Sequence, residues 1–205
     1  MDASTARHQI YHPLVMAYET IQPPFTLNFR EMTKGQLKDY FDWFQEILPQ
    51  RLDGLEQAVK TTLEFEGWRL DFSPTSLDRL GEWFAEQVET RRRTDDEILE
   101  LEDRVSMPME VSEEDLTNRT FSLAVDVGMY LTQVLLKSHP TLRWDQQFGN
   151  KKDVDYGQPV LVRFGPAPFN PVRLTVTLAY GIASEKKSGK GLRDLYDVWV
   201  GMIRE

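Results

Sequence analysis

Apolar residues recur at helical spacing between residues 33 and 63. A capping-box pattern at Thr33–Gln36 predicts a helix start, followed by apolar positions every three or four residues. A second series continues the pattern beyond Pro49. Because proline opens a helix readily but disrupts one that it interrupts, we expect an N-terminal helical pair, antiparallel or kinked. The apolar positions of the two series are Leu37, Tyr40, Phe41, Phe44 and Leu48, then Leu52, Leu55, Val59 and Leu63.

Three further stretches also have a helical period. The first follows Ser73 and Pro74, which predict a helix start, and carries its apolar residues between positions 77 and 88. The second is expected to begin at Ser112 with Asp115 and to run to about Ser138, where His139 and Pro140 end it. The third closes the chain, with one apolar side formed by Leu192, Leu195, Trp199, Met202 and Ile203.

Four segments are rich in β-favouring residues or alternate between apolar and polar positions, as half-buried strands do. They are residues 68–72 (WRLDF), 142–144 (LRW), 159–164 (PVLVRF) and 172–180 (VRLTVTLAY). We therefore predict an α+β fold with a mainly antiparallel sheet of three to four strands packed with helices. Residues 1–32 show no period and form an irregular N-terminal arm, while residues 33–205 form a single domain.

The charge of the chain is concentrated in one segment. Residues 82–115 contain thirteen acidic residues and four arginines and so have a net charge of −9. This equals the net charge of all 205 residues. Residues 89–115 are predicted to be a mobile acidic excursion, in which a few apolar residues could support a short helix. An acidic surface disfavours nucleic acid and favours a basic protein partner, although such a segment can also act as a solubilising loop. The candidate binding residues are Asp95, Asp96, Glu97, Glu100, Glu102 and Asp103.

Residues 120–137 are the most apolar stretch of the chain, yet Asp126 lies at their centre. On a helical wheel the apolar residues cover one broad face, and the polar residues fall on a narrow seam. We expect a solvated or hydrogen-bonded stripe along this seam; a cleft for a small ligand or an enzymatic reaction is the alternative. The seam consists of Arg119, Ser122, Asp126, Tyr130, Gln133 and Lys137.

No catalytic signature, cofactor motif or metal site emerges from the sequence. Residues 184–192 (SEKKSGKGL) lack the Walker pattern, no serine lies in a GxSxG motif, and the three histidines lack an HExxH context. The chain has no cysteine, its first residues lack the features of a secretion signal, and its apolar runs are too polar for a membrane span. We expect a cytoplasmic protein without a cofactor, and an enzyme is the less favoured class.

The order of these elements resembles a group of small bacterial cytoplasmic proteins of unassigned function. In that group a segment like LDFSPTSLDRL (residues 70–80) precedes an apolar helix and a strand with tryptophan, and the resemblance extends from Trp68 to Leu178. Some of these proteins accompany polymorphic toxins as immunity proteins. The resemblance carries over no catalytic residue, and the acidic segment has no counterpart in it.

Together these features favour a non-enzymatic binding protein, most concretely an immunity-type inhibitor of a basic partner such as a nucleic-acid-cleaving toxin. Two other classes remain open. One is a small-ligand binder or enzyme that uses the seam around Asp126 and Tyr130. The other is a structural subunit of a larger assembly, docked through Tyr196 and Trp199 of the last helix.

Overall fold

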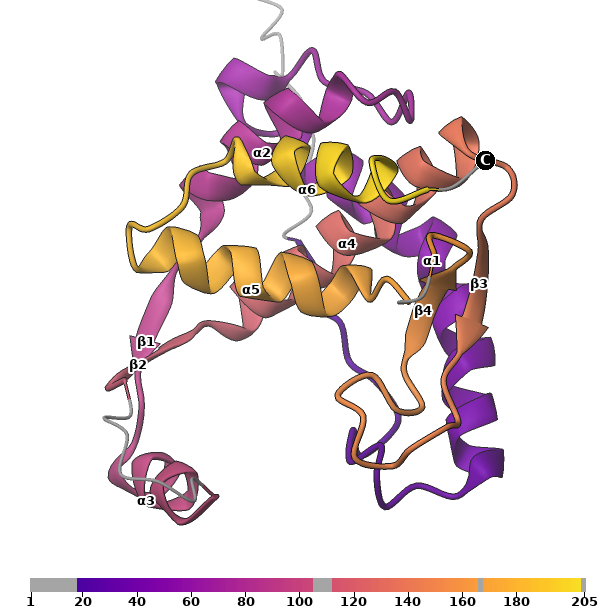
Figure 1. Ribbon diagram of the computed structural model, residues 1–205. Coiled ribbons are helices and arrows are strands. Elements are labelled where there is room, and N and C mark those ends of the chain that lie inside the picture. Colours follow the sequence, from indigo (N-terminus) through magenta and orange to yellow (C-terminus); the bar gives the residue numbers. More distant parts are fainter. Residues whose placement is uncertain (1–17, 105–111, 166–167, 204–205) are drawn as a thin grey trace, which may run out of the picture.

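The computed structural model describes residues 18–104, 112–165 and 168–203 (Figure 1). The fold is α+β: helices form most of the body, and short strands form two small ribbons. Residues 18–33 contain no helix or strand and run along the body before the first helix begins. The elements in chain order are α1 (Lys34–Lys60), η1 (Leu63–Phe65), α2 (Ser76–Gln87), β1 (Thr90–Arg92), α3 (Asp95–Arg104), β2 (Glu114–Leu116), α4 (Asn118–Ser138), β3 (Arg143–Gln146), β4 (Pro159–Val162), α5 (Pro171–Ala183) and α6 (Gly191–Val200).

The first helix is continuous from Lys34 to Lys60, so the antiparallel form of the predicted helical pair is wrong. The capping box is present: the Thr33 hydroxyl accepts from the Gln36 backbone at 3.3 Å, and the Gln36 side chain accepts from the Thr33 backbone at 2.9 Å. Pro49 lies inside the helix on its exposed side, where water can bind the carbonyl that proline leaves without a donor. The buried stripe continues past it from Leu48 to Leu52, and its packing holds the helix together across the proline.

Helix α4 is the centre of the body, and α1, α2, α5 and α6 pack around it (Figure 1). Its core residues, among them Leu123, Val127 and Leu131, are fully buried, as the helical wheel predicts. The helix begins at Asn118, where Thr117 accepts a hydrogen bond from the Thr120 backbone at 3.1 Å, and it ends before His139. The predicted helix start at Ser112 is therefore wrong, because this stretch pairs as a strand instead.

Helix α5 corrects the largest strand prediction. Residues 172–180 alternate as a strand would, but Asn170 caps them by accepting from the Arg173 backbone at 2.9 Å, and Pro171 occupies the first turn. Packing on α4 then decides the conformation over β propensity: Thr175 is buried and its hydroxyl donates to the Ala124 carbonyl at 2.7 Å. Gly128 allows this close approach, since a Cβ there would lie 2.8 Å from the Thr175 hydroxyl.

Two separate antiparallel ribbons replace the predicted sheet of three to four strands. The pairing of β3 with β4 confirms that residues 142–144 and 159–164 contain neighbouring strands, with Trp144 opposite Leu161. The second ribbon joins β1 to β2 and lies at the base of the acidic segment (Figure 1).

Residues 68–72 form no strand in the structure. Their backbone donors bond locally or to side chains: Trp68 and Asp71 donate to nearby backbone carbonyls, whereas Leu70 donates to Glu56 and Phe72 to the Tyr130 hydroxyl, both at 3.1 Å. Phe72 has a φ of 55°, which interrupts the extended conformation. The segment therefore packs on the helices without pairing to another strand.

Candidate functional site

The acidic segment is an ordered arm over its described residues. It leaves the body through the β1–β2 ribbon and carries α3 at its tip (Figure 1). At the base, the Thr120 hydroxyl of α4 donates to the Glu89 carbonyl at 3.0 Å and accepts from the Glu89 backbone at 2.9 Å. The Tyr180 hydroxyl of α5 donates to Asp115 at 2.5 Å. These contacts tie the ribbon to two helices of the body.

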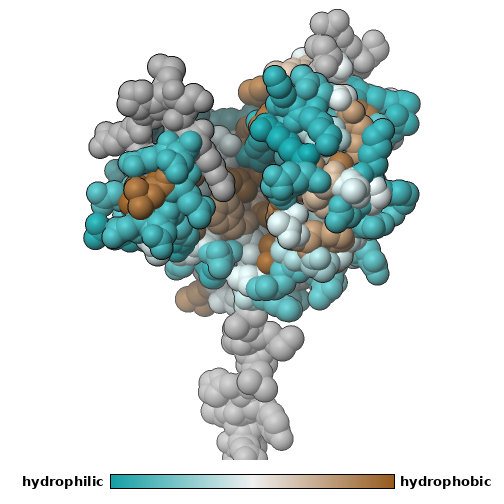
Figure 2. Space-filling view, turned by 90° about the horizontal axis from the view of Figure 1, so that it is seen from below, coloured by the Kyte–Doolittle hydropathy of each residue, from teal (hydrophilic) through white to brown (hydrophobic). Residues whose placement is uncertain are grey.

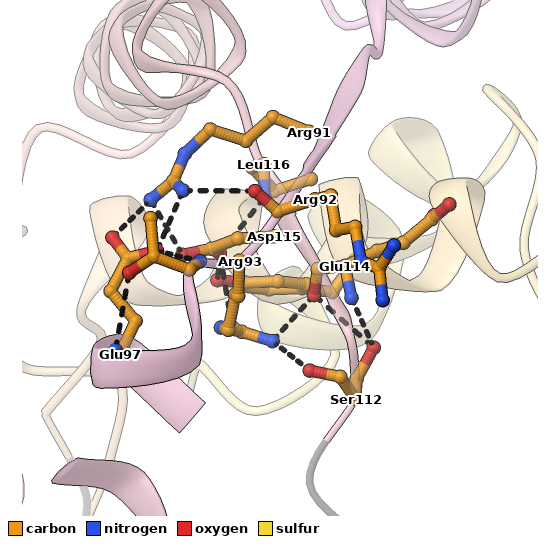
Figure 3. A network of polar contacts seen from close by, with 10 residues as sticks. Arg91, Arg92, Arg93, Glu97, Ser112, Glu114, Asp115 and Leu116 are labelled. Atoms are coloured by element: carbon orange, nitrogen blue, oxygen red, sulfur yellow. Dashed lines mark hydrogen bonds and ion pairs between the residues drawn. The ribbon is translucent and has the colours of Figure 1, made fainter. Parts of the chain in front are cut away.

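A network of arginines and carboxylates joins α3 to the ribbon (Figure 3). Arg91 donates two hydrogen bonds to Glu97, at 2.8 and 2.7 Å, in the bidentate geometry that suits a guanidinium and a carboxylate. Arg93 forms an ion pair with Asp115 at 3.1 Å and donates to the Ser112 carbonyl at 2.7 Å. Arg91 and Arg93 therefore act inside the arm and offset part of its acidic charge.

Glu97 has a structural role in this network. It accepts from the Thr94 backbone at 2.9 Å and so completes a capping box at the start of α3. Hydrogen bonds from Arg91, followed by that from Thr94, lower the pKa of Glu97 to about 2. Of the six candidate binding residues, Glu97 thus caps α3 and joins it to the ribbon through Arg91.

Four of the other candidates are exposed on α3, and the structure gives their side chains no hydrogen bond or ion pair within the described residues. These are Asp95, Asp96, Glu102 and Asp103. Leu99 of the same helix is 59% exposed, while Ile98 and Leu101 are half-buried. The arm therefore presents carboxylates next to an exposed apolar side chain. Glu100 is also exposed.

The predicted seam on α4 is covered, and Asp126 is fully buried. Arg51 of α1 donates to both Asp126 oxygens at 2.8 Å, and the Tyr18 hydroxyl donates to the same carboxylate. Arg51 also donates to the Tyr18 hydroxyl at 2.7 Å and to the Glu19 carbonyl at 2.9 Å. Burial raises the pKa of Asp126 to about 6, and the bonds from Arg51 and Tyr18 act against this rise.

Three other seam residues, Tyr130, Ser122 and Arg119, bond to neighbouring elements. Tyr130 is fully buried and its hydroxyl lies 2.7 Å from the Ser76 hydroxyl. Ser122 accepts from the Ile21 backbone at 3.0 Å, and Arg119 donates to Gln87 at 2.8 Å. Gln133 is half-buried. The seam is therefore the hydrogen-bonded form of the predicted stripe, at the contact between α4 and the segments that cover it, and it is not a cleft open at Asp126 and Tyr130.

A cavity of about 450 Å³ lies beside this covered seam, and Ser122 is the one seam residue in its described lining. Residues 20–29 form one wall, and the beginnings of α4, β4 and α5 form the others. The molecule seen from below is hollowed, with hydrophobic side chains in the hollow between the arm that carries α3 and the rest of the body (Figure 2). The apolar lining of the cavity includes Ile21, Leu27, Phe29, Phe121, Val125 and Val172.

Of the two residues of the last helix predicted as a docking surface, Tyr196 is buried and Trp199 is half-buried. Tyr196 is 7% exposed, and the Trp199 ring packs edge-on against Phe169 and Phe164, with centroid distances of 4.6 and 5.3 Å. The Trp199 ring thus packs on the residues that follow β4. Only part of the Trp199 side chain is therefore accessible for docking, and the assembly hypothesis stays a prediction.

Sequence reasoning missed Arg51 and Tyr18, the partners of Asp126. A signal for Arg51 was present, because it lies between the apolar positions Leu48 and Leu52 on the buried side of α1. A carboxylate in an apolar helix requires such a basic partner. Tyr18 carried no comparable signal, since it lies in a segment without a period.

No family model, curated protein or solved structure matches the chain. Within the described residues, no group of three or more acidic or histidine side chains is placed to hold a metal ion. The same part of the chain contains no helix that is both long and apolar enough to cross a membrane. Function is therefore inferred from the chain's own geometry.

Proposed function

We propose that this chain is a non-enzymatic binding protein whose acidic arm docks a basic protein partner. The observation that supports this function best is that the carboxylates of the arm fall into two groups, one paired with arginines and one exposed. Glu97 and Asp115 pair with arginines and hold α3 in place, while Asp95, Asp96, Glu102 and Asp103 remain exposed on the helix. A solubilising loop needs no such internal framework.

The surface of α3 has the chemistry of a docking site for a cationic protein. Exposed carboxylates attract a basic surface over a distance and accelerate association. Leu99, 59% exposed, supplies the apolar contact that such interfaces bury at their centres. An immunity-type inhibitor of a nucleic-acid-cleaving toxin is a concrete form of this function, because such a toxin needs a basic surface for its substrate.

The test compares two variants with the same change in charge. The arm variant carries Asp95→Asn, Asp96→Asn, Glu102→Gln and Asp103→Asn, and retains Glu97 so that α3 keeps its cap. The control variant neutralises four exposed carboxylates of the body: Asp39, Glu46, Asp53 and Glu64. Immobilised wild-type and variant chains are incubated with an extract of the native host, and the captured proteins are quantified.

A basic protein captured by the wild-type and control chains but lost with the arm variant is the expected result. With that partner purified, association should slow as salt rises from about 50 to 500 mM, mostly through the on-rate. Both variants should melt near the wild-type temperature, since exposed charges contribute little to stability. If no captured protein distinguishes the arm variant from the control, the arm is not the docking site.

A further inference from the structure

We propose that the cavity beneath residues 20–29 binds a small, neutral, mainly apolar molecule that carries a hydrogen-bond-accepting oxygen, which the Tyr40 hydroxyl recognises. This site is separate from the carboxylates of the arm and does not depend on the function proposed for them. Its volume of about 450 Å³ lies within the range of small-molecule sites, roughly 300–1,000 Å³.

The lining of the cavity selects against charge. Apolar side chains from three segments form its walls, and the described polar lining residues are neutral hydroxyls and amides: Thr20, Tyr40, Ser122, Asn118, Gln22, Gln158 and Asn170. A charged ligand would lose its hydration here without gaining an ionic partner, and this costs far more than burying a neutral group. A neutral molecule with a large apolar part fits the chemistry of the walls.

Tyr40 is a buried polar group of this lining that has no partner among the described residues. Its side chain is 9% exposed, yet its hydroxyl makes no hydrogen bond within the described residues. In that part of the chain, the completely enclosed side-chain atoms without a partner are Gln45 Nε2 and Trp144 Nε1, so the Tyr40 hydroxyl retains access to solvent. Burial raises the pKa of Tyr40 to about 12, which keeps the phenol protonated as a donor.

The cavity is also pre-organised. Phe25, Phe29 and Trp43 surround the Tyr40 ring, with centroid distances of 5.7, 5.1 and 5.6 Å, and fix its position. The wall formed by residues 20–23 is held where the Ile21 backbone donates to Ser122 and where Tyr18, just before it, bonds to Asp126. Binding of a ligand at this site therefore loses little free energy to the ordering of protein side chains.

The experiment uses the full chain and the probe 6-propionyl-2-(dimethylamino)naphthalene, a neutral naphthalene with one carbonyl. We expect saturable binding at one site, with a blue shift of its fluorescence. Tyr40→Phe should weaken binding about three- to tenfold, the effect of one neutral hydrogen bond. Tyr156→Phe, in the same aromatic cluster but outside the cavity lining, should leave the affinity unchanged.

A second pair of variants tests the place of binding. Val172→Phe fills the cavity and should reduce the affinity more than tenfold, whereas Val176→Phe, one turn later on α5 and outside the lining, should leave it unchanged. Near-ultraviolet circular dichroism and the melting temperature check that each variant is folded. If Val172→Phe fails to fold, the comparison of Tyr40→Phe with Tyr156→Phe decides.

Several results would overturn the proposal. They are no saturable binding of the probe, equal losses in Tyr40→Phe and Tyr156→Phe, or equal losses in the two folded valine variants. A sulfonated naphthalene, 8-anilinonaphthalene-1-sulfonate, that competes at the same site with equal affinity would refute the selection against charge. Dimerisation in analytical ultracentrifugation that Val172→Phe abolishes would assign the cavity to a second copy of the chain.

Discussion

At the scale of single residues, the carboxylate of Asp126 joins three parts of the chain. It lies on α4, receives both hydrogen bonds of the Arg51 guanidinium from α1, and binds the Tyr18 hydroxyl of the N-terminal segment. Its two oxygen atoms accept three hydrogen bonds from groups within the protein, and its side chain has no exposed surface. The residue is therefore a structural anchor.

Asp126→Asn should destabilise the fold strongly. The change leaves the Arg51 guanidinium largely buried without a counter-charge, and breaking a buried pair in this way costs about 3–5 kcal/mol. Urea unfolding measures the loss. Asp42→Asn, which removes the exposed partner of Lys38 on α1, is the matched control and should change stability little. Comparable stabilities of the two variants would contradict the anchoring role.

The ionised form of Glu97 contributes to the order of α3 through its bonds to Arg91 and Thr94. Its pKa in the folded chain is about 2, below the ordinary value of 4.5, because Arg91 hydrogen-bonds its charged form. Its contribution to the order of α3 is thus fully present above about pH 4.5 and is lost as the pH falls through about 2.

An NMR titration of the Glu97 side chain should therefore show a midpoint near 2. In Arg91→Gln the midpoint should rise toward 4.5, and in Arg92→Gln, whose side chain pairs with Glu113 instead, it should stay low. A midpoint near 4.5 in the wild-type chain would show that the bidentate pair does not persist in solution.

At the scale of elements, the contact between α4 and α5 organises the body. Gly128 lets the two helices approach so closely that the Thr175 hydroxyl reaches the Ala124 carbonyl. Glycine is otherwise unfavourable inside a helix, by about 1 kcal/mol relative to alanine. The close approach explains why this position lacks a side chain.

Gly128→Ala should lower stability although it improves helix propensity. The added Cβ would lie 2.8 Å from the Thr175 hydroxyl and 3.0 Å from the Pro171 carbonyl oxygen, and overpacking of this kind costs about 1–3 kcal/mol. Gly54→Ala in α1 is the control, because nothing lies within 4 Å of its new Cβ, and it should raise stability by about 0.5–1 kcal/mol. Thermal or urea unfolding of the two variants measures both signs.

At the scale of the whole molecule, the arm and the body have different roles. The body contains the buried core, which is centred on α4. Helix α3 contributes none of its described residues to that core and carries acidic residues on its surface. The arm is therefore expected to be dispensable for folding, whatever it binds.

Replacing residues 93–113 by an Asn-Gly turn should test this separation. Arg92 and Glu114 are opposite one another in the antiparallel ribbon, so a two-residue turn can join them. The shortened chain should melt cooperatively, with a temperature close to that of the wild type, and should fail to bind the partner of the arm. Loss of cooperative unfolding would mean that the arm supports the core.

The sequence by itself determined the elements whose signals are local. The capping box at Thr33, the apolar face of α4 and the segments that become β3 and β4 could all be read from spacing and residue type. The division of charge along the chain could also be read directly. These features depend on neighbours within a few residues, which a one-dimensional pattern contains.

Only the tertiary structure decided features that depend on distant contacts. Residues 172–180 became a helix because α4 offered a groove at Gly128, and Pro49 stayed inside α1 because its buried stripe packs on both sides of the proline. The structural role of Asp126 depends on its hydrogen bonds with Arg51, 75 residues away, and with Tyr18, 108 residues away. A buried charge is stable only with a partner, and folding alone brings these partners together.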